Sequence, residues 1–416
     1  MPRPFPRYVL LTLLGAALAA GAAGAFAWSV DPYAAHGRPR LEGFNAKKPH
    51  VYTHARLAKR TLAAAVRPRT LFLGNSRVDA GFDPRSPSLP PSARPTFNFG
   101  IPGQGLDGDY GNLVRTSGLD RVQRVVIGLD FLDFPFRPSE PAPGLKAPDV
   151  PTALAGTRLR KFFETTLSID ALVHSALTVG AQDDPFANSM TPLGLDTFDA
   201  HLGHAKREGY RAIFHQRNLE NARTYIAKPR AIRGPDGRLS PSFAWLGWIL
   251  DWCRARGVAV DLVIYPYHAH ILELFHLSGL WPVFEDWKRV LADYVAETRA
   301  GGGGDGFRIA LWDFSGYHRI ASEEVPAPGD RRTQTRWYWE AGHFKTALGD
   351  RILARLFDGA PDGGFGVRLS PDSVGPAIVQ LRAGRAKWRA DHPADAAYLA
   401  ALYQRVAGRR SGDRAD

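Results

Sequence analysis

The chain has 416 residues, 44% of them hydrophobic, which is enough apolar material for one large domain with an insertion or for two or three smaller domains. The 53 lysine and arginine residues against 41 aspartate and glutamate residues give a formal charge of +12. This charge suits an anionic surface or polymer, such as lipid headgroups or acidic glycan, although a solvated basic surface without a specific partner is the simpler interpretation. The basic residues are scattered and accompany no binding motif, which argues against nucleic acid, and the single cysteine, Cys253, excludes an intrachain disulfide and a cysteine-based zinc site.

The N-terminal segment predicts export. Arg3 and Arg7 precede an uncharged run that continues to Trp28, about the 20 residues needed to cross a hydrocarbon core. Basic residues on the short leading side place the N-terminus in the cytoplasm and the body in the periplasm or at the cell exterior. We therefore expect residues 1–30 to be a single-pass anchor in the inner (cytoplasmic) membrane. Ala25-Phe26-Ala27 resembles a signal-peptidase site, so secretion after cleavage is the alternative.

Beyond the anchor, a polar stem and a leading helix occupy residues 31–69, and short apolar strands then alternate with helices. This alternation predicts a mostly parallel sheet with helices on both faces, in one domain over 70–365. A long helical stretch at 135–240, whose clearest helix covers 158–179, predicts an inserted lid or substrate-facing subdomain. Residues 366–416 form a tail with a helix at 394–406. The expected strands are 70–74, 96–101, 124–131, 258–265 and 307–314, and the other expected helices are 241–257, 283–299 and 346–357.

Ligands of such sheets bind at the carboxyl ends of the strands, where a serine and a histidine stand in this chain. Ser76 follows the first strand, and a strand-to-helix turn offers backbone N–H groups to a developing oxyanion; the simpler interpretation of Ser76 alone is a helix cap. His343 precedes the 346–357 helix, and Glu340 can accept its Nδ1 proton so that Nε2 deprotonates Ser76. A packing or capping role for His343 is the alternative.

Other polar residues give weaker signals. His268 and His270 follow the fourth strand, where we favour a structural role over substrate contact, and both over a metal site, because no carboxylate pattern accompanies them. His201 and His204 are expected at the surface of the insertion. No G-x-G-x-x-G follows the first strand and no phosphate-binding loop is present, which argues against a nucleotide binder or oxidoreductase. We expect no cofactor and no metal.

Four short motifs occur in order at predicted strand ends and before the 346–357 helix: Gly74-Asn75-Ser76-Arg77, Asn98 to Gly105, Gly128-Leu129-Asp130-Phe131, and Glu340 to His343. Together they resemble the SGNH (GDSL-type) hydrolase superfamily, and most of all its membrane-anchored envelope members, such as proteins of alginate O-acetylation and of D-alanyl transfer to teichoic acids. The motif-bearing segments span 70–357, and most of the insertion is unmatched.

The resemblance implies site residues and a fold. Ser76 would be the nucleophile, His343 the general base and Glu340 its carboxylate partner, while the N–H groups of Ser76 and Gly103 would line the oxyanion hole. The expected fold is α/β: a three-layer flavodoxin-like sandwich with a mostly parallel five-stranded sheet and a long helical insertion between strands three and four. We expect the substrate-binding side chains to be Arg77, Gln104 and His268.

Two residues depart from the family pattern. The third motif usually supplies an asparagine donor to the oxyanion, but Asp130 stands there, and an ionised carboxylate would repel the charge that it should stabilise. Loss of one such donor costs roughly 10²–10³ in rate. Either Asp130 is turned away or protonated, or the hole uses only the N–H groups of Ser76 and Gly103. Glu340 replaces the usual aspartate, and its longer side chain can still orient an imidazole.

The predicted function is a serine acyl-ester hydrolase or O-acyltransferase, with acetyl as the expected acyl group. Its substrate or acceptor would be an envelope or exported polysaccharide, or another acylated glycan. Acyl transfer would imply a membrane-bound acyltransferase as the partner that supplies the acyl group. The alternative is a non-catalytic envelope scaffold or glycan-binding protein with the same fold, an alternative that Asp130 keeps open.

Overall fold

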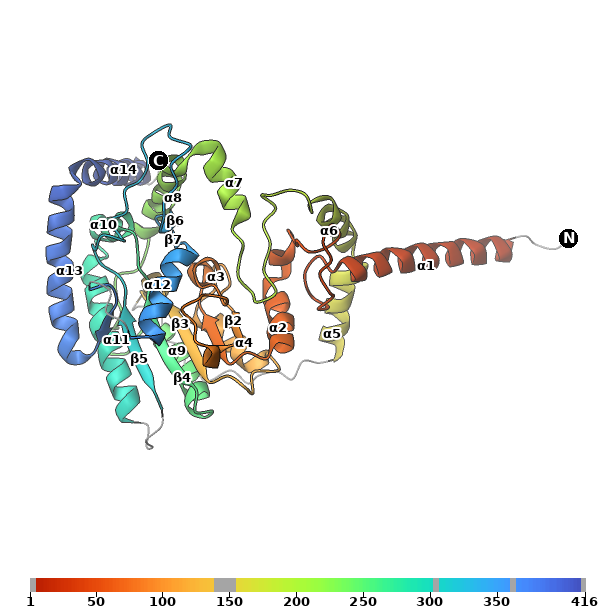
Figure 1. Cartoon of the computed structure of the whole chain (residues 1–416), viewed down its shortest axis with the longest axis horizontal. Coiled ribbons are helices and arrows are strands. Elements are labelled where there is room, and N and C mark those ends of the chain that lie inside the picture. The colour runs from red at the N-terminus through yellow and green to blue at the C-terminus, as the bar shows by residue number, and fades with distance from the viewer. Residues whose placement is uncertain (1–4, 138–154, 302–306, 360–363, 413–416) are drawn as a thin grey trace.

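The computed structural model describes residues 5–137, 155–301, 307–359 and 364–412, and its centre is a six-stranded sheet (Figure 1). The strand order is β2-β1-β3-β4-β5-β8; the pairs from β2 to β5 are parallel, and β8 runs antiparallel to β5. The strands of the sheet are β1 Thr70–Leu73, β2 Thr96–Asn98, β3 Arg124–Leu129, β4 Ala259–Ile264, β5 Ile309–Asp313 and β8 Val367–Leu369. A mostly parallel α/β sheet is thus confirmed.

The predicted count of five strands is wrong, because β8 adds a sixth. β8 has three residues, of which Val367 and Arg368 are exposed, so it lacks the continuous apolar run that marks the central strands. Every residue of β1 is buried, as is every residue of β3 and β4 after the first. Strands covered on both faces have this pattern, whereas a short edge strand does not.

Helices surround the sheet and supply much of the core. α3 packs against α12, α4 packs against α9, and α11 lies along β5. The predicted helices 241–257, 283–299 and 346–357 correspond to α9, α11 and α12. The helices are α1 Phe5–Val30, α2 Ala55–Val66, α3 Ser76–Gly81, α4 Leu106–Arg115, α5 Ala155–Phe162, α6 Ile169–Gly180, α7 Asp199–Glu208, α8 Tyr210–Tyr225, α9 Pro241–Arg254, α10 Ala269–Leu277, α11 Trp281–Ala300, α12 Thr346–Phe357, α13 Pro371–Asp391 and α14 Pro393–Gly412.

The insertion is helical, as predicted, but the expected helix at 158–179 is broken. A π-helical turn, Phe163–Leu167, follows α5, and the Ser168 side chain then accepts a hydrogen bond from the N–H of Ala171 at 3.0 Å to begin α6. The apolar periodicity runs through this break, so it predicts one helix where the serine cap begins a second. Residues 138–154 of the insertion lie outside the described residues.

The tail is more ordered than its sequence predicts. α13 precedes the expected helix, which is α14, and begins with a capping box between Ser370 and Ser373. α13 packs on α11, and α14 packs on α8 and α10. Trp388 and Leu399 are buried in the same core as the sheet, so both helices are integral to the fold.

The N-terminal helix α1 projects from the body (Figure 1). Its segment Arg7–Val30 is long and apolar enough to cross a membrane, and most of it is exposed. A signal sequence has the same length and composition, so retention of the anchor stays a prediction. Only the base of α1 packs on the protein, against α6 and the π-helical turn.

Candidate active site

Ser76 lies at the carboxyl edge of the sheet, as the first residue of α3. The cap position belongs to Asn75, whose Oδ1 accepts the N–H of Arg77 at 3.0 Å. The capping interpretation of Ser76 is therefore wrong, and its hydroxyl is free for another partner. The turn before it needs glycine: Gly74 has φ +141°, and a Cβ there would lie 2.8 Å from the Tyr265 hydroxyl.

His343 brings its ring to this hydroxyl from a small hairpin made of β6, Tyr338–Glu340, and β7, His343–Phe344. The Nε2 atom of His343 lies 2.7 Å from Ser76 Oγ, although the two residues are 267 positions apart. The Nδ1 atom of the same ring is hydrogen-bonded to Glu340. A proton on Nδ1 satisfies that carboxylate and leaves Nε2 to accept the Ser76 O–H.

Glu340 is fully buried, yet its surroundings favour the ionised form. Burial alone raises the pKa of Glu340, but His343, the Arg217 guanidinium at 3.2 Å and the Gly342 N–H at 2.6 Å lower it to about 2. Glu340 is therefore a carboxylate at neutral pH. It fixes the orientation of the imidazole and can stabilise the imidazolium that forms when His343 takes a proton.

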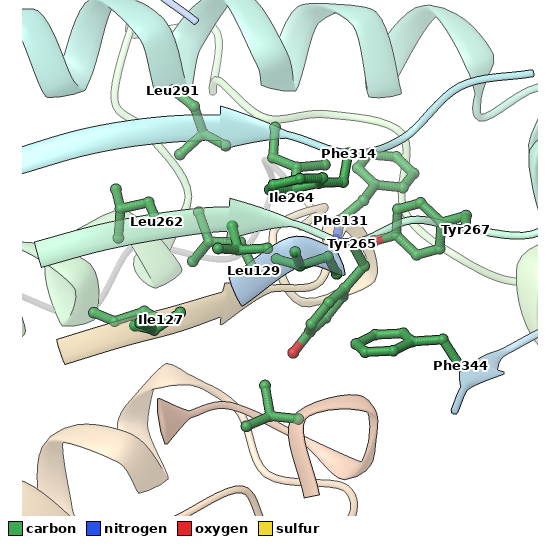
Figure 2. Packing of buried hydrophobic residues seen from close by; sticks show 14 of the residues in the cluster. Ile127, Leu129, Phe131, Leu262, Ile264, Tyr265, Tyr267, Leu291, Phe314 and Phe344 are labelled. Carbon is green, nitrogen blue, oxygen red and sulfur yellow. Dashed lines mark hydrogen bonds between the residues drawn. The ribbon is translucent and has the colours of Figure 1, made fainter. Parts of the chain in front are cut away.

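Apolar packing between the loop that carries Ser76 and the hairpin that carries His343 fixes the position of the nucleophile relative to the base. The Phe344 ring, next to His343, lies 5.6 Å from the ring of Phe82 and 6.2 Å from that of Tyr265, and Figure 2 shows Phe344 facing Tyr265 beyond the strand ends. Behind them α12 approaches α3 so closely that a Cβ on Gly349 would lie 1.8 Å from the Gly81 carbonyl oxygen. A buried apolar contact of this kind leaves little freedom for relative motion.

Asp130 accepts hydrogen bonds with both carboxylate oxygens. Oδ2 pairs with the Arg77 guanidinium and accepts from Asn75 Nδ2 at 3.0 Å. Oδ1 accepts from the Tyr267 hydroxyl at 3.1 Å and the Leu132 N–H at 3.2 Å. These contacts suit an ionised acceptor, so Asp130 is not the oxyanion donor for which it was considered. Arg77 compensates its charge, which removes the repulsion expected from the sequence.

Two backbone donors stay available beside the serine. Among the residues that the structure describes, the N–H groups of Ser76 and Gly103 have no hydrogen-bond acceptor. Gly103 lies in an exposed turn with φ +70°, a conformation that favours glycine. The Ile101 N–H donates to the Gly74 carbonyl at 3.0 Å, which holds the loop of Gly103 against the loop of Ser76. The oxyanion role of these two N–H groups stays a prediction.

The three side chains predicted to bind substrate are buried and serve the fold. Arg77 donates from Nε to the Gly342 carbonyl at 2.7 Å, in addition to its ion pair with Asp130. The side-chain amide Nε2 of Gln104 donates a hydrogen bond to Asp109 Oδ1 at 2.8 Å. His268 caps α10 and lies 3.0 Å from the Glu323 carbonyl, and burial lowers its pKa to about 3. These contacts favour the structural interpretation of His268.

Helices α7 and α8 of the insertion supply neighbours of the site that sequence reasoning missed. The Phe198 ring lies 5.7 Å from that of His343 and 5.4 Å from that of Trp339, and His201 lies 5.8 Å from Trp339. His201 is partly exposed and burial lowers its pKa to about 4, so its expected surface position holds only in part, whereas His204 is exposed, as expected. No local motif marks these residues, since their partners are over a hundred positions away.

Two cavities lie at different edges of the sheet. One, of about 220 Å³, is lined by residues of α7 and α8, among them His201 and Arg217, and of the triad only Glu340 lines it. A larger one, of about 720 Å³, lies at the amino ends of the strands, by Thr70 and Arg124, away from Ser76 and His343. We place the candidate site at Ser76, His343 and Glu340, where a nucleophile, a base and a carboxylate meet, and not at the larger cavity. Comparison with protein-family models and with curated proteins finds no match to this chain.

Proposed function

We propose that the chain is an SGNH-type serine acyl-ester hydrolase or O-acyltransferase that acts through Ser76, His343 and Glu340. The observation that supports this most strongly is the 2.7 Å separation of Ser76 Oγ and His343 Nε2, with Glu340 on the far ring nitrogen. Triads are recognised by such geometry and not by sequence position. The order 2-1-3-4-5 of the parallel strands, which is that of flavodoxin-like sheets, agrees with the proposal.

The chemistry follows from the positions of these groups. His343 Nε2 takes the Ser76 proton while Oγ attacks the ester carbonyl carbon, and the N–H groups of Ser76 and Gly103 stabilise the resulting oxyanion. The intermediate collapses as the leaving alkoxide takes the proton from His343, which releases an alcohol and leaves an acyl-Ser76 ester. Water or a glycan hydroxyl then gives a proton to His343 and attacks that ester. The second intermediate collapses as Ser76 Oγ leaves and takes the proton back from His343, which gives an acid and free Ser76 in hydrolysis, or a new ester and free Ser76 in transfer.

The geometry weakens the scaffold alternative. That alternative depended on the repulsion expected from Asp130, and the carboxylate is now paired with Arg77 and faces three further donors. The remaining candidate donors are two backbone N–H groups, and the loss of one preorganised oxyanion donor costs on the order of 2.7–4 kcal/mol in enzymes that depend on it.

We infer a glycan of the envelope as substrate or acceptor, and acetyl as the acyl group. Phe198 and Trp339 form an aromatic wall beside His343, and Trp339 is partly exposed, as an aromatic face that contacts a sugar must be. The apolar helix α1 would keep the site close to the inner membrane with the body outside, and the charge of +12 suits acidic polymers. A transferase would receive its acyl group from a membrane-bound acyltransferase.

The test is hydrolysis of p-nitrophenyl acetate and release of acetate from an O-acetylated glycan by the full chain in detergent. We expect Ser76→Ala to abolish both activities, and Ser88→Ala, at another partly exposed serine, to leave them unchanged. Equal activity of Ser76→Ala and the unmodified protein would exclude the acyl-enzyme. Addition of an unacetylated glycan separates transfer from hydrolysis, because transfer places acetyl on the glycan.

A further inference from the structure

The insertion presents an apolar face to solvent next to α1. The α5–α6 hairpin, defined here as α5, the π-helical turn and α6, exposes eight large apolar side chains. Ile169 is the most exposed of them, at 80%. The set, which we call the hairpin face, comprises Leu159, Phe162, Phe163, Leu167, Ile169, Leu172, Val173 and Leu177. So many exposed large apolar side chains on three successive elements indicate an interaction surface.

The hairpin is fixed to the base of α1. Leu167 packs on Gly24, where an added Cβ would lie 2.5 Å from Leu167 Cδ2, and Ala171 is buried in a small core with Ala27 and Tyr33. Figure 1 shows α5 and α6 flanking the end of α1 that enters the body. A hydrogen bond of 2.7 Å between the Tyr33 hydroxyl and His174 Nδ1 adds a polar tie. The depth of α1 in a membrane therefore sets the depth of the hairpin.

That depth can be worked out from the helix rise. A hydrocarbon core of about 30 Å takes about 20 residues at 1.5 Å each, so a span that starts after Arg7 ends near Trp28. Gly24 then lies about 6 Å inside the outer boundary. Leu167, which contacts Gly24, is at the level of the acyl chains. The hairpin face is thus at the depth where apolar side chains are stable and water is scarce.

The polar residues around the face suit a headgroup region. Trp28 is partly exposed at the calculated boundary, where tryptophan is enriched, and the Arg38 guanidinium stacks on it at 3.8 Å. Arg160 is exposed on α5 and pairs with Glu164 at 3.2 Å. The other acid of the hairpin, Asp170, lies in the first turn of α6, where the helix dipole stabilises a negative charge.

We propose that the hairpin face inserts into the outer leaflet of the membrane that α1 spans, so that lipid acyl chains cover it. The protein is then held by one span and one interfacial hairpin, and the second attachment prevents the body from rotating about α1. The proposal requires α1 to stay in the membrane. It does not depend on the chemistry proposed for Ser76.

The test is the environment of spin labels on the full chain in lipid-only nanodiscs of phosphatidylethanolamine and phosphatidylglycerol. Cys253 is fully buried, so cysteines introduced at exposed positions are labelled selectively. Three single variants are compared by collision with oxygen, which concentrates in lipid, and with a water-soluble nickel chelate: Ile169→Cys on the hairpin face, Leu14→Cys in α1 as the lipid reference, and Val379→Cys on α13 as the water reference. Their side chains are 80%, 53% and 64% exposed, so none disturbs the core.

We expect the oxygen-to-nickel collision ratio at Ile169→Cys to exceed that at Val379→Cys several-fold and to approach that at Leu14→Cys, which lies deeper in the membrane. A ratio at Ile169→Cys equal to that at Val379→Cys, with Leu14→Cys in lipid, would overturn the insertion while the span stands. Shielding of Ile169→Cys from both reagents in native membranes, with exposure to water in nanodiscs, would instead assign the face to a membrane protein and would also overturn the proposal. Activity of Ser76 does not enter any of these outcomes.

Discussion

The ion pair between Arg77 and Asp130 makes a sharp prediction about stability. Arg77 is 9% exposed and Asp130 6%, so both charges are removed from water. Arg77→Met leaves Asp130 with three neutral donors and no cation, and an uncompensated buried charge of this kind costs about 3–5 kcal/mol. The lost bond from Arg77 Nε to the Gly342 carbonyl adds about 1 kcal/mol. The sum is a large part of an ordinary domain's stability of about 5–15 kcal/mol.

A double-mutant cycle separates the pair from its surroundings. Asp130→Asn should destabilise by a similar amount, and the double variant should be more stable than the sum of the single effects predicts, by about 1–3 kcal/mol. The assay is urea unfolding of the full chain in detergent, followed by tryptophan fluorescence. Arg67→Met is the control, since its 2.6 Å pair with Asp120 has side chains 48% and 59% exposed and should be worth less than about 1 kcal/mol. Additive single effects, or a cost for Arg77→Met no larger than the control's, would refute the reasoning.

Three further predictions concern the loops that carry the triad. Glu340→Gln should lower kcat for p-nitrophenyl acetate by roughly 10²–10⁴, because a neutral amide neither selects the Nδ1–H tautomer of His343 nor stabilises its cation; a loss below tenfold would contradict this. Folding lowers the pKa of the Glu340 carboxyl from 4.5 to about 2. The ionised carboxylate therefore contributes stability that is complete above pH 4.5 and is lost as the pH falls towards 2. Because Glu340→Gln removes this titration, it should flatten the acid side of a plot of melting temperature against pH. Gly349→Ala should cost about 1–3 kcal/mol in urea unfolding and also reduce activity, because its Cβ would collide with the Gly81 carbonyl and push α12 from α3. Gly408→Ala, in open space in α14, should be neutral or slightly stabilising.

The central strands and the position of Ser76 could be predicted from local pattern and simple topology, and the meeting of Ser76 with His343 from the order of the motifs that resemble those of SGNH hydrolases. Continuous apolar runs identify strands that are buried on both faces, and parallel strands bring their carboxyl ends to one edge. Each residue that follows such a strand is therefore expected at that edge. Glu340 was found for the same kind of reason, since a spacing of three residues keeps it near His343.

The partners of the site residues could not be predicted, because they depend on contacts far apart in the chain. Nothing near Asp130 indicates that Arg77, 53 positions earlier, neutralises it, and Arg77 itself looked like a substrate ligand. Phe198 reaches His343 only because the insertion folds back over the site. The edge strand β8 and the break before α6 were missed because a three-residue strand and a single serine cap leave almost no trace in hydrophobic periodicity.

The reactivity of Ser76 is the property on which the proposed function depends. A fluorophosphonate probe reacts with a serine only when a neighbouring base removes its proton, so the most direct measurement is the rate of probe attachment, followed by intact mass and peptide mapping of the full chain. We expect one adduct, on Ser76, formed at a rate that falls by roughly 10²-fold or more in His343→Ala. Absence of an adduct, or an adduct on Ser76 at a rate that His343→Ala does not change, would contradict a catalytic triad in this protein.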